Sequence, residues 1–462
     1  MSSINTKKER QLLLLTLKHS QKEAVASSTM TATCDNFMNA FALYLGASSL
    51  QMGFLTAFPQ LLGSIMQMVS VWLGTVLNRK LLVLIAAAAQ CLLMFAIMLL
   101  ALLNDGAVVK TFIILVVLYH GASHTIQPQW RAWMGSIVPQ KSRGAFFAGR
   151  TRLTMATTLI IFLGGGLFLS WSERLNLVGA GFAFMFLAAA IGRSVSCYHL
   201  WRMHDPVPLP VVAETNQLVS TLRLFAHAMH DRTFRNYTIF IACMQGMVAI
   251  SAPFFAVYML NELHFTYFQY ALNLMASIAV QFLMLRFWGK ISDSQGNRLV
   301  MLVCGFMIPI LPILWLFSSS FYYLLLVQMI SGLFWSGFTL TTANYLYDIR
   351  PHHTNFATYA AVQALFTAVM VFIGALGGGL LASIAPTLAG WLPFRLGSAL
   401  FIVFTVSGVM RALVLAWFLP RAEEPTVRSH PELLQVIFRV ARFNAISGVV
   451  LDWLTLTEKK KP

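Results

Sequence analysis

The sequence predicts an all-α polytopic membrane protein with 12 transmembrane helices in two pseudo-symmetric six-helix bundles. One basis is that apolar runs of roughly twenty residues recur along the chain, each long enough to cross the hydrocarbon core as a helix. A second is composition, because 58% of the residues are hydrophobic and only 10% are charged. A third is that Lys and Arg concentrate in alternate loops. Barrel strands would be shorter and would alternate in polarity.

The predicted spans follow one another with short loops between them. In chain order they cover residues 24–46, 51–77, 81–103, 111–138, 151–171, 177–200, 236–260, 268–288, 299–317, 321–346, 356–384 and 396–419.

A polar segment, residues 201–235, divides the spans six and six, and its three prolines identify it as a cytoplasmic linker. Residues 24–200 and 236–419 are then the two bundles. Residues 1–23 are expected to be a cytoplasmic N-terminal interfacial segment, because polar residues interrupt the apolar stretch too early for a signal peptide. Residues 420–462 are expected to be a cytoplasmic amphipathic tail on the leaflet surface. A thirteenth span there is disfavoured by Arg439 and Arg442.

The formal net charge of +16 raises the question of a nucleic-acid partner. The odd-numbered loops hold only three basic residues, Lys110, Arg174 and Arg395, so the positive charge lies mainly on the face shared by both termini. This is the positive-inside distribution, which predicts cytoplasmic termini in a plasma (inner) membrane. It favours the lipid bilayer as partner, with no nucleic acid, and we expect a monomer. Arg411 lies inside the last span and is interpreted as structural.

The two halves resemble each other in sequence. Residues 164–170 read GGGLFLS and residues 377–383 read GGGLLAS, at corresponding places in the fifth and eleventh spans. The loop 288–298 reads WGKISDSQGNR and is similar to the G-x-x-x-D-x-x-G-x-R signature of the major facilitator superfamily (MFS). Its counterpart at 72–80 is shorter and lacks the acidic residue and the second glycine. The resemblance implies the MFS fold, with the first, fourth, seventh and tenth spans lining a central cavity.

One carboxylate, Asp35, lies deep in a predicted span, with Thr31 and Asn39 one turn away on the same face. An ionisable group in a bilayer is costly, so it is expected to face a cavity or a partner. The functional interpretation is a proton-coupling or substrate-cation site. The alternative is a structural carboxylate bonded to neighbouring hydroxyls.

The fourth span carries a second polar stripe. His120, His124, Gln127 and Arg131 follow one another at helical spacing, and Pro128 is expected to kink the helix between them. Such a stripe favours a water- or substrate-lined face, on which His124 would meet Asp35 if the resemblance holds. Hydrogen-bonded core histidines and an Arg131 that snorkels or gates are the alternatives.

Neutral polar groups extend this predicted cavity, although individually most such residues more often make contacts between helices than bind a ligand, with Trp335 as the exception. They are Gln60, Gln67, Gln245, Ser251, Asn273, Ser277, Gln281, Gln328, Trp335, Thr339, Gln363 and Thr367.

Within the loop 288–298 we predict a gating role for Gly289, Asp293, Gly296 and Arg298. Gly289 is expected at a close approach of two helices, and Asp293 is expected to face the fifth span near residues 147–152 in one gating state.

No enzyme signature competes, since the chain has no Walker loop, G-x-S-x-G or HExxH, and its five cysteines show no CxxC spacing for a metal. We expect no cofactor. The leading hypothesis is a secondary active transporter that moves a small organic substrate by alternating access, coupled to H⁺. Sodium-coupled or facilitative transport is one alternative, and a non-transporting sensor or a membrane-embedded transferase is another. Polar side chains favour a polar solute, whereas the apolar surface is also compatible with lipophilic export.

Overall fold

The computed structural model describes residues 7–103, 108–138, 143–205, 229–349, 356–391, 393 and 396–421. All the regular elements of this part of the chain are helices. Most of the predicted linker and all but the start of the predicted tail lie outside the described residues, as do Arg395 and the loop that begins at Pro351.

The N-terminal half contains α1 (Lys7–Thr33), η1 (Asp35–Phe37), α2 (Met38–Tyr44), α3 (Ser49–Val76), α4 (Arg79–Ala101), α5 (Val108–Ile137), α6 (Arg143–Arg174) and α7 (Val178–Arg202). The C-terminal half contains α9 (Arg232–Val257), η3 (Tyr258–Glu262), α10 (Tyr267–Gln295), α11 (Asn297–Met307), α12 (Ile310–Leu314), α13 (Phe321–Ile349), α14 (Phe356–Gly390), α15 (Leu400–Phe418) and η5 (Leu419–Arg421).

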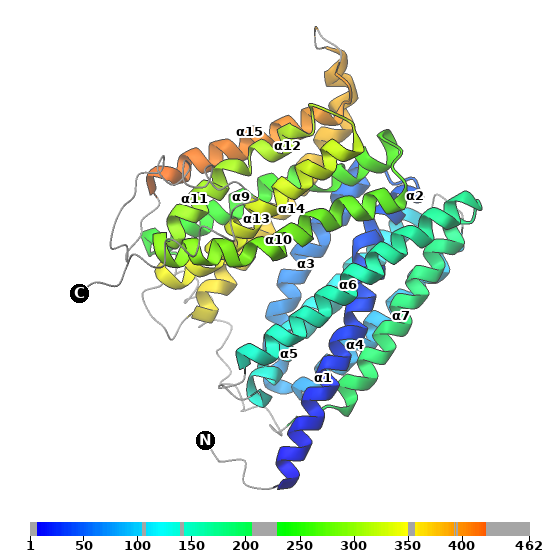
Figure 1. The fold of residues 1–462 in the computed structure, drawn as a ribbon, viewed down its shortest axis with the longest axis vertical. Helices are drawn as coiled ribbons and strands as arrows, with labels where there is room; N and C mark the ends of the chain where they lie inside the picture. The colour runs from blue at the N-terminus through cyan, green and yellow to red at the C-terminus, as the bar shows by residue number, and fades with distance from the viewer. Residues whose placement is uncertain are drawn as a thin grey trace, which may run out of the picture.

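These helices account for the predicted spans. Within the described residues, 11 helical segments are long and apolar enough to cross a membrane. The first predicted span adds to them, divided among α1, η1 and α2. Figure 1 shows two groups of helices that converge near α2 and diverge toward the ends where α1 begins and α15 finishes. We call that end the terminal side and the other the opposite side. The predicted fold class is confirmed.

The first and ninth spans are each broken, and only the break in the ninth coincides with prolines. The first was expected to be continuous, but α1 stops at Thr33 and a 3₁₀ turn at Asp35–Phe37 precedes α2, with no proline in the segment. The ninth is divided between α11 and α12, where Pro309 and Pro312 stand. Proline has no backbone N–H, so a proline in a helix removes one hydrogen bond of the ladder.

Arg411 supplies a hydrogen-bond donor at the break between α11 and α12. Pro312 cannot donate to the carbonyl of Ile308, four residues earlier, and the Arg411 Nη1 atom donates to that oxygen at 3.2 Å. Its Nη2 atom donates to Ser251 Oγ at 2.7 Å, which connects α15 to α9. Arg411 is only 3% exposed, so these bonds form away from water. They agree with the structural interpretation of this residue.

The N-terminal segment was expected to be an interfacial helix that leads into the first span, and α1 runs without interruption from Lys7 into that span. Leu13 and Leu17 pack against a cluster that contains Trp133 and Met203, and these contacts hold the extension upright against the bundle. Thr16 Oγ1 also accepts a hydrogen bond from the backbone N–H of His204 at 3.2 Å.

The repeated glycines lie where the bundles meet. A Cβ added to Gly166 of α6 would come within 2.8 Å of Ala271 Cβ on α10. In the matching contact between α3 and α14, a Cβ on Gly53 would lie 2.8 Å from the Ala375 carbonyl oxygen and 3.1 Å from Gly379 Cα. The two glycine-rich segments therefore permit close approach at two of the contacts between the bundles.

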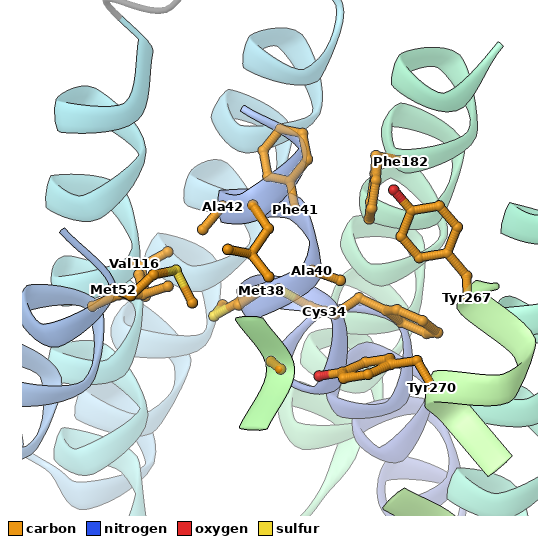
Figure 2. Close-up of a cluster of buried hydrophobic side chains, with 14 of the residues drawn as sticks. Cys34, Met38, Ala40, Phe41, Ala42, Met52, Val116, Phe182, Tyr267 and Tyr270 are labelled. Carbon is orange, nitrogen blue, oxygen red and sulfur yellow. The ribbon is translucent and has the colours of Figure 1, made fainter. Parts of the chain in front are cut away.

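Aromatic residues close the opposite side. Figure 2 shows Tyr270 beneath Cys34 and Tyr267 beside Phe182, so that α10 reaches across to the N-terminal bundle. The Tyr267 and Phe182 rings meet edge to face with centroids 5.4 Å apart. Tyr270 donates from its hydroxyl to the Asn36 carbonyl oxygen at 3.4 Å. The bundles are thus joined on this side, and any opening between them faces the terminal side.

Candidate functional site

A cavity of about 430 Å³ lies between the bundles, in their terminal halves. Four helices supply most of its walls: α3, α9, α13 and α14, with one residue from α5. Its polar lining residues are Gln60, Ser64, Gln67, His124, Tyr237, Thr339, Thr342, Gln363 and Thr367, and the rest of the described lining is Ile241 and alanines. No Asp, Glu, Lys or Arg belongs to this lining. A polar wall without formal charge is suited to hydrogen bonding with an uncharged solute.

The wall of the N-terminal bundle is built around His124. Its Nδ1 atom lies 3.3 Å from Gln67 Nε2, so the imidazole and the amide hold each other in place. Gly63 makes room for the ring, since a Cβ there would lie 2.4 Å from His124 Cδ2. Gln60, Ser64 and Gln67 repeat at intervals of four and three, which brings all three to one face of α3.

The wall of the C-terminal bundle is built around Tyr237. Its hydroxyl donates to the Thr342 carbonyl oxygen of α13 and interacts with Gln363 of α14. Thr342 Oγ1 donates to Phe338 O at 2.7 Å. Tyr237 thus joins α9 to the two helices beside it and positions the amide of Gln363 at the cavity.

Some predicted cavity residues lie one or more turns deeper on the same helix faces. Gln245 follows Ile241 on α9 by four residues. Trp335 precedes Thr339 on α13 by four residues and packs edge-on against Phe338, and Gln328 lies two turns further along that face. None of these three belongs to the lining of the described cavity.

The other residues of the polar stripe on the fourth span lie in different environments. Gln127 and Arg131 are exposed, on the side of α5 opposite the exposed Ile114 and Leu118. His120 lies between His124, with which it interacts electrostatically, and the ring of Tyr119. Of this stripe, only His124 lines the cavity.

Asp35 does not meet His124 as the resemblance had suggested. Its carboxyl group lies at the break of the first span and is acted on by Tyr119 of α5 and Arg193 of α7, inside the N-terminal bundle. The contact with Tyr119 falls short of hydrogen-bond geometry, because Asp35 Oδ1 and Tyr119 Oη are both buried without a partner among the described residues. The predicted hydroxyl neighbour Thr31 instead donates to the Ser28 carbonyl oxygen. Asp35 and His124 are connected only indirectly, along Tyr119 and His120.

Asn273 is a second polar group left unsatisfied. It is fully buried, and neither its amide nitrogen nor its amide oxygen has a partner among the described residues. Asn39, by contrast, is partly exposed on α2. A buried amide without a hydrogen-bond partner costs free energy.

Sequence reasoning missed a buried polar network beside Asp35. Glu23 Oε2 accepts a hydrogen bond from Arg150 Nη2 at 2.6 Å, and its Oε1 accepts one from Ser196 Oγ at 3.2 Å. Arg193 Nη1 donates to that same Ser196 oxygen at 3.0 Å. Arg150 also covers the Trp130 ring, 4.2 Å from its centroid. The available signal was Arg193, a cation within the sixth predicted span.

The predicted gating loop turns at Gly296, which has a φ of 90°. That angle favours glycine, so Gly296 is required by the turn between α10 and α11. Asp293 is exposed and Arg298 partly exposed. Gly289 faces α13 without crowding in this conformation, because an added Cβ would meet only Leu340 Cδ2 at an ordinary contact distance of 3.9 Å.

The shorter counterpart loop obtains its acidic partner from elsewhere. Arg79 Nε donates to Asp205 Oδ2 at 2.9 Å, just beyond the end of α7. Arg79 Nη2 also donates to Ser136 Oγ at 2.8 Å. Asp205 therefore replaces the carboxylate that the loop itself lacks. Within the described residues, no group of three or more His, Cys, Asp or Glu side chains could hold a metal ion.

Comparison with known proteins agrees with this architecture. The sequence model of the Major Facilitator Superfamily matches residues 237–457. No curated protein sequence matches the chain.

Solved structures share the fold over nearly the whole chain. The D-xylose-proton symporter has a TM-score of 0.65 at 12% identity, covering 89% of this chain and 97% of its own. The nucleoside transporter NupG has a TM-score of 0.58 at 12% identity, covering 89% and 98%. A bacterial homologue of the lysosomal transporter Spinster, in an inward-facing and occupied conformation, has a TM-score of 0.58 at 12% identity, covering 90% and 97%. Residues 237–457 thus match the major facilitator superfamily in sequence, and nearly the whole chain shares the fold of these solved transporters.

Proposed function

We propose that this protein is a secondary active transporter that moves an uncharged, polar organic solute by alternating access, driven by protons that bind Asp35. The observation that carries the proposal is a buried carboxylate oxygen without a partner at the break of the first span. It lies inside the N-terminal bundle and is connected to the polar cavity between the bundles along Tyr119 and His120. A membrane-embedded carboxylate that no structural bond satisfies is typical of a coupling site.

The lining of the cavity supports the substrate class. A charged solute entering it would lose hydration without meeting an opposite charge, whereas amides, hydroxyls and an imidazole offer both donors and acceptors to a hydroxylated solute. The same groups disfavour a purely lipophilic substrate. Nucleosides and D-xylose, which appear in the names of two structurally similar transporters, are uncharged hydroxylated solutes of this kind.

The line of residues along α5 supports coupling between the two places. His124 lies at the cavity, His120 interacts with it, and Tyr119 extends from there to Asp35. We propose that protonation of Asp35 is sensed at the cavity along this line. A neutral carboxyl group tolerates a dry state that an ionised one does not, so its protonation favours the conformational exchange.

The positive-inside distribution supports a cytoplasmic terminal side, in a plasma (inner) membrane, with the protein acting as a monomer. The described conformation is then inward-open. Sodium-coupled or facilitative transport remains the alternative within the class.

The test is uptake by sealed proteoliposomes. The panel contains radiolabelled D-xylose, D-glucose, uridine and adenosine, with glutamate and lysine as charged controls, each with and without an imposed pH gradient. The proposal expects uptake of one or more uncharged solutes that the gradient enhances, and none of the charged ones. Uptake of glutamate or lysine alone would contradict the substrate class, and uptake indifferent to the gradient would contradict proton coupling.

A further inference from the structure

A cluster of basic groups lies at the terminal end of the N-terminal bundle, away from the cavity between the bundles. His19 of α1 and His199 of α7 face each other with their Nδ1 atoms 2.9 Å apart. Lys22 and Arg202 are close enough to act on this pair electrostatically. Burial, with the cations of Arg202 and Lys22, lowers the pKa of His19. Four basic groups are therefore gathered at one place.

The carboxylate nearest to this cluster is already engaged. Glu23 acts on His199, but its two oxygens accept from Arg150 and Ser196, and the residue is only 4% exposed. Lys22 and Arg202, in contrast, are exposed. The cluster thus presents positive charge to the outside, which is complementary to an anion.

A hollow of about 450 Å³ opens at this cluster. It is lined by Leu12, Leu15, Thr16, His19, Trp201 and Arg202. Leu15 is 54% exposed and Trp201 is 59% exposed, so apolar and basic surfaces stand side by side. Tryptophan and arginine together at a helix end are typical of the interface between lipid headgroups and acyl chains.

A second, almost wholly apolar groove continues from the first. It lies between α4 and α7, is lined by Ala88, Leu92 and Cys197 among others, and shares Trp201 with the basic hollow. Leu92 is 70% exposed at this groove, in the part of α4 that lies within the membrane. A headgroup-sized basic hollow is thereby joined to a groove that can hold an acyl chain.

We propose that these two hollows form one binding site for an anionic phospholipid, with the phosphate at Arg202 and Lys22 and an acyl chain between α4 and α7. The charge selects the anionic headgroup, and the apolar groove selects a lipid over a soluble phosphate. A lipid bound there would bridge α1 to α7 at the end where α1 extends out of the bundle.

The test uses delipidated full-length protein in a neutral detergent, with bound lipid counted by native mass spectrometry. Dioleoyl phosphatidylglycerol is compared with dioleoyl phosphatidylcholine and with inorganic phosphate. The double variant Lys22→Gln/Arg202→Gln removes the charge, and Ala88→Trp fills the apolar groove. Arg174→Gln is the matched control for an exposed cation, and Ile160→Trp for an exposed lipid-facing position. An unchanged gel-filtration profile shows that each variant is folded, and for the charge variant retained binding of phosphatidylcholine shows it as well.

The proposal expects phosphatidylglycerol to bind more tightly than phosphatidylcholine, by about fivefold for each of the two cations. The charge variant should abolish this preference, Ala88→Trp should weaken binding of phosphatidylglycerol, and both controls should behave as the unmodified protein. Equal affinity for the two lipids would overturn the proposal. So would inorganic phosphate that displaces the lipid and is indifferent to Ala88→Trp, because that would reveal a soluble-anion site. Equal losses in the control variants would indicate non-specific lipid contact and would also overturn it.

Discussion

The His124 imidazole is held against Gln67, with Nδ1 and Nε2 3.3 Å apart, and this contact joins α5 to α3 at the wall of the cavity. Gly63 lies behind the ring, where any side chain would collide with it. His124→Gln should weaken solute binding and transport together by about tenfold, because it removes a positioned hydrogen-bonding group. Gly63→Ala should do the same by displacing the ring. Binding is measured by substrate protection against thermal unfolding.

Gly164→Ala is the control for Gly63→Ala, since a Cβ at Gly164 would meet nothing within 4 Å. Full activity in Gly63→Ala would contradict the role assigned to the position of His124.

The closure of the opposite side depends on Gly166, which allows α6 to approach Ala271 and Tyr267 of α10. Gly166→Leu should separate these helices and shift the protein toward the conformation open on the opposite side. A cysteine introduced at Thr339, in the cavity, should then react about fivefold more slowly with a maleimide supplied from the terminal side.

Gly164 lies two residues from Gly166, and an added Cβ there would meet nothing within 4 Å. The control variant Gly164→Leu should therefore leave the labelling rate unchanged. If Gly166→Leu also leaves it unchanged, the glycine does not control closure.

The pair of Glu23 and Arg150 is expected to stabilise the N-terminal bundle. Arg150→Gln leaves a carboxylate that is 5% exposed with only Ser196 as donor, which should cost about 3 kcal/mol. The apparent Tm in detergent should fall by several degrees, and the double variant Glu23→Gln/Arg150→Gln should recover part of the loss. Arg174→Gln, an exposed cation, serves as control. A double variant less stable than Arg150→Gln alone would contradict a compensating pair.

Asp293 tests the gating loop. It is exposed in this conformation, so it is free of tight packing while the terminal side is open. Asp293→Asn should slow turnover while leaving solute affinity within a few-fold, because the carboxylate is expected to bond to a facing helix end only when that side closes. Turnover is measured by uptake and affinity by thermal protection. Lost affinity at normal turnover would argue for a binding role instead.

Much of the fold was predictable from sequence because lipid leaves few alternatives: a run of about twenty apolar residues has to be a helix, and basic loops mark its ends. The break in the first span at Asp35 was not predictable from the sequence, because no proline or glycine lies at it. The expectation that Asp35 could face His124 came from the resemblance, which places the first and fourth spans around one cavity. In the structure Asp35 instead lies near Tyr119 and Arg193, inside the N-terminal bundle.

The lining of the cavity was likewise predicted only in part. Polarity inside an otherwise apolar predicted span identified Gln60, Gln67 and Thr339, which the structure places in the lining. Tyr237 and Thr342 were missed, since aromatic and hydroxyl side chains near helix ends are common and carry little signal. The network of Glu23 and Arg193 requires contacts between residues far apart in sequence, which spacing does not reveal.

The central claim is that Asp35 couples protons to solute movement, and one measurement tests it most directly. Proteoliposomes carrying Asp35→Asn are compared with the unmodified protein for accumulation of a transported solute on a pH gradient and for counterflow exchange of that solute without a gradient. The account predicts that the variant loses accumulation but retains counterflow, because the cavity is intact while the proton site is gone. Continued accumulation on the pH gradient by Asp35→Asn would contradict it.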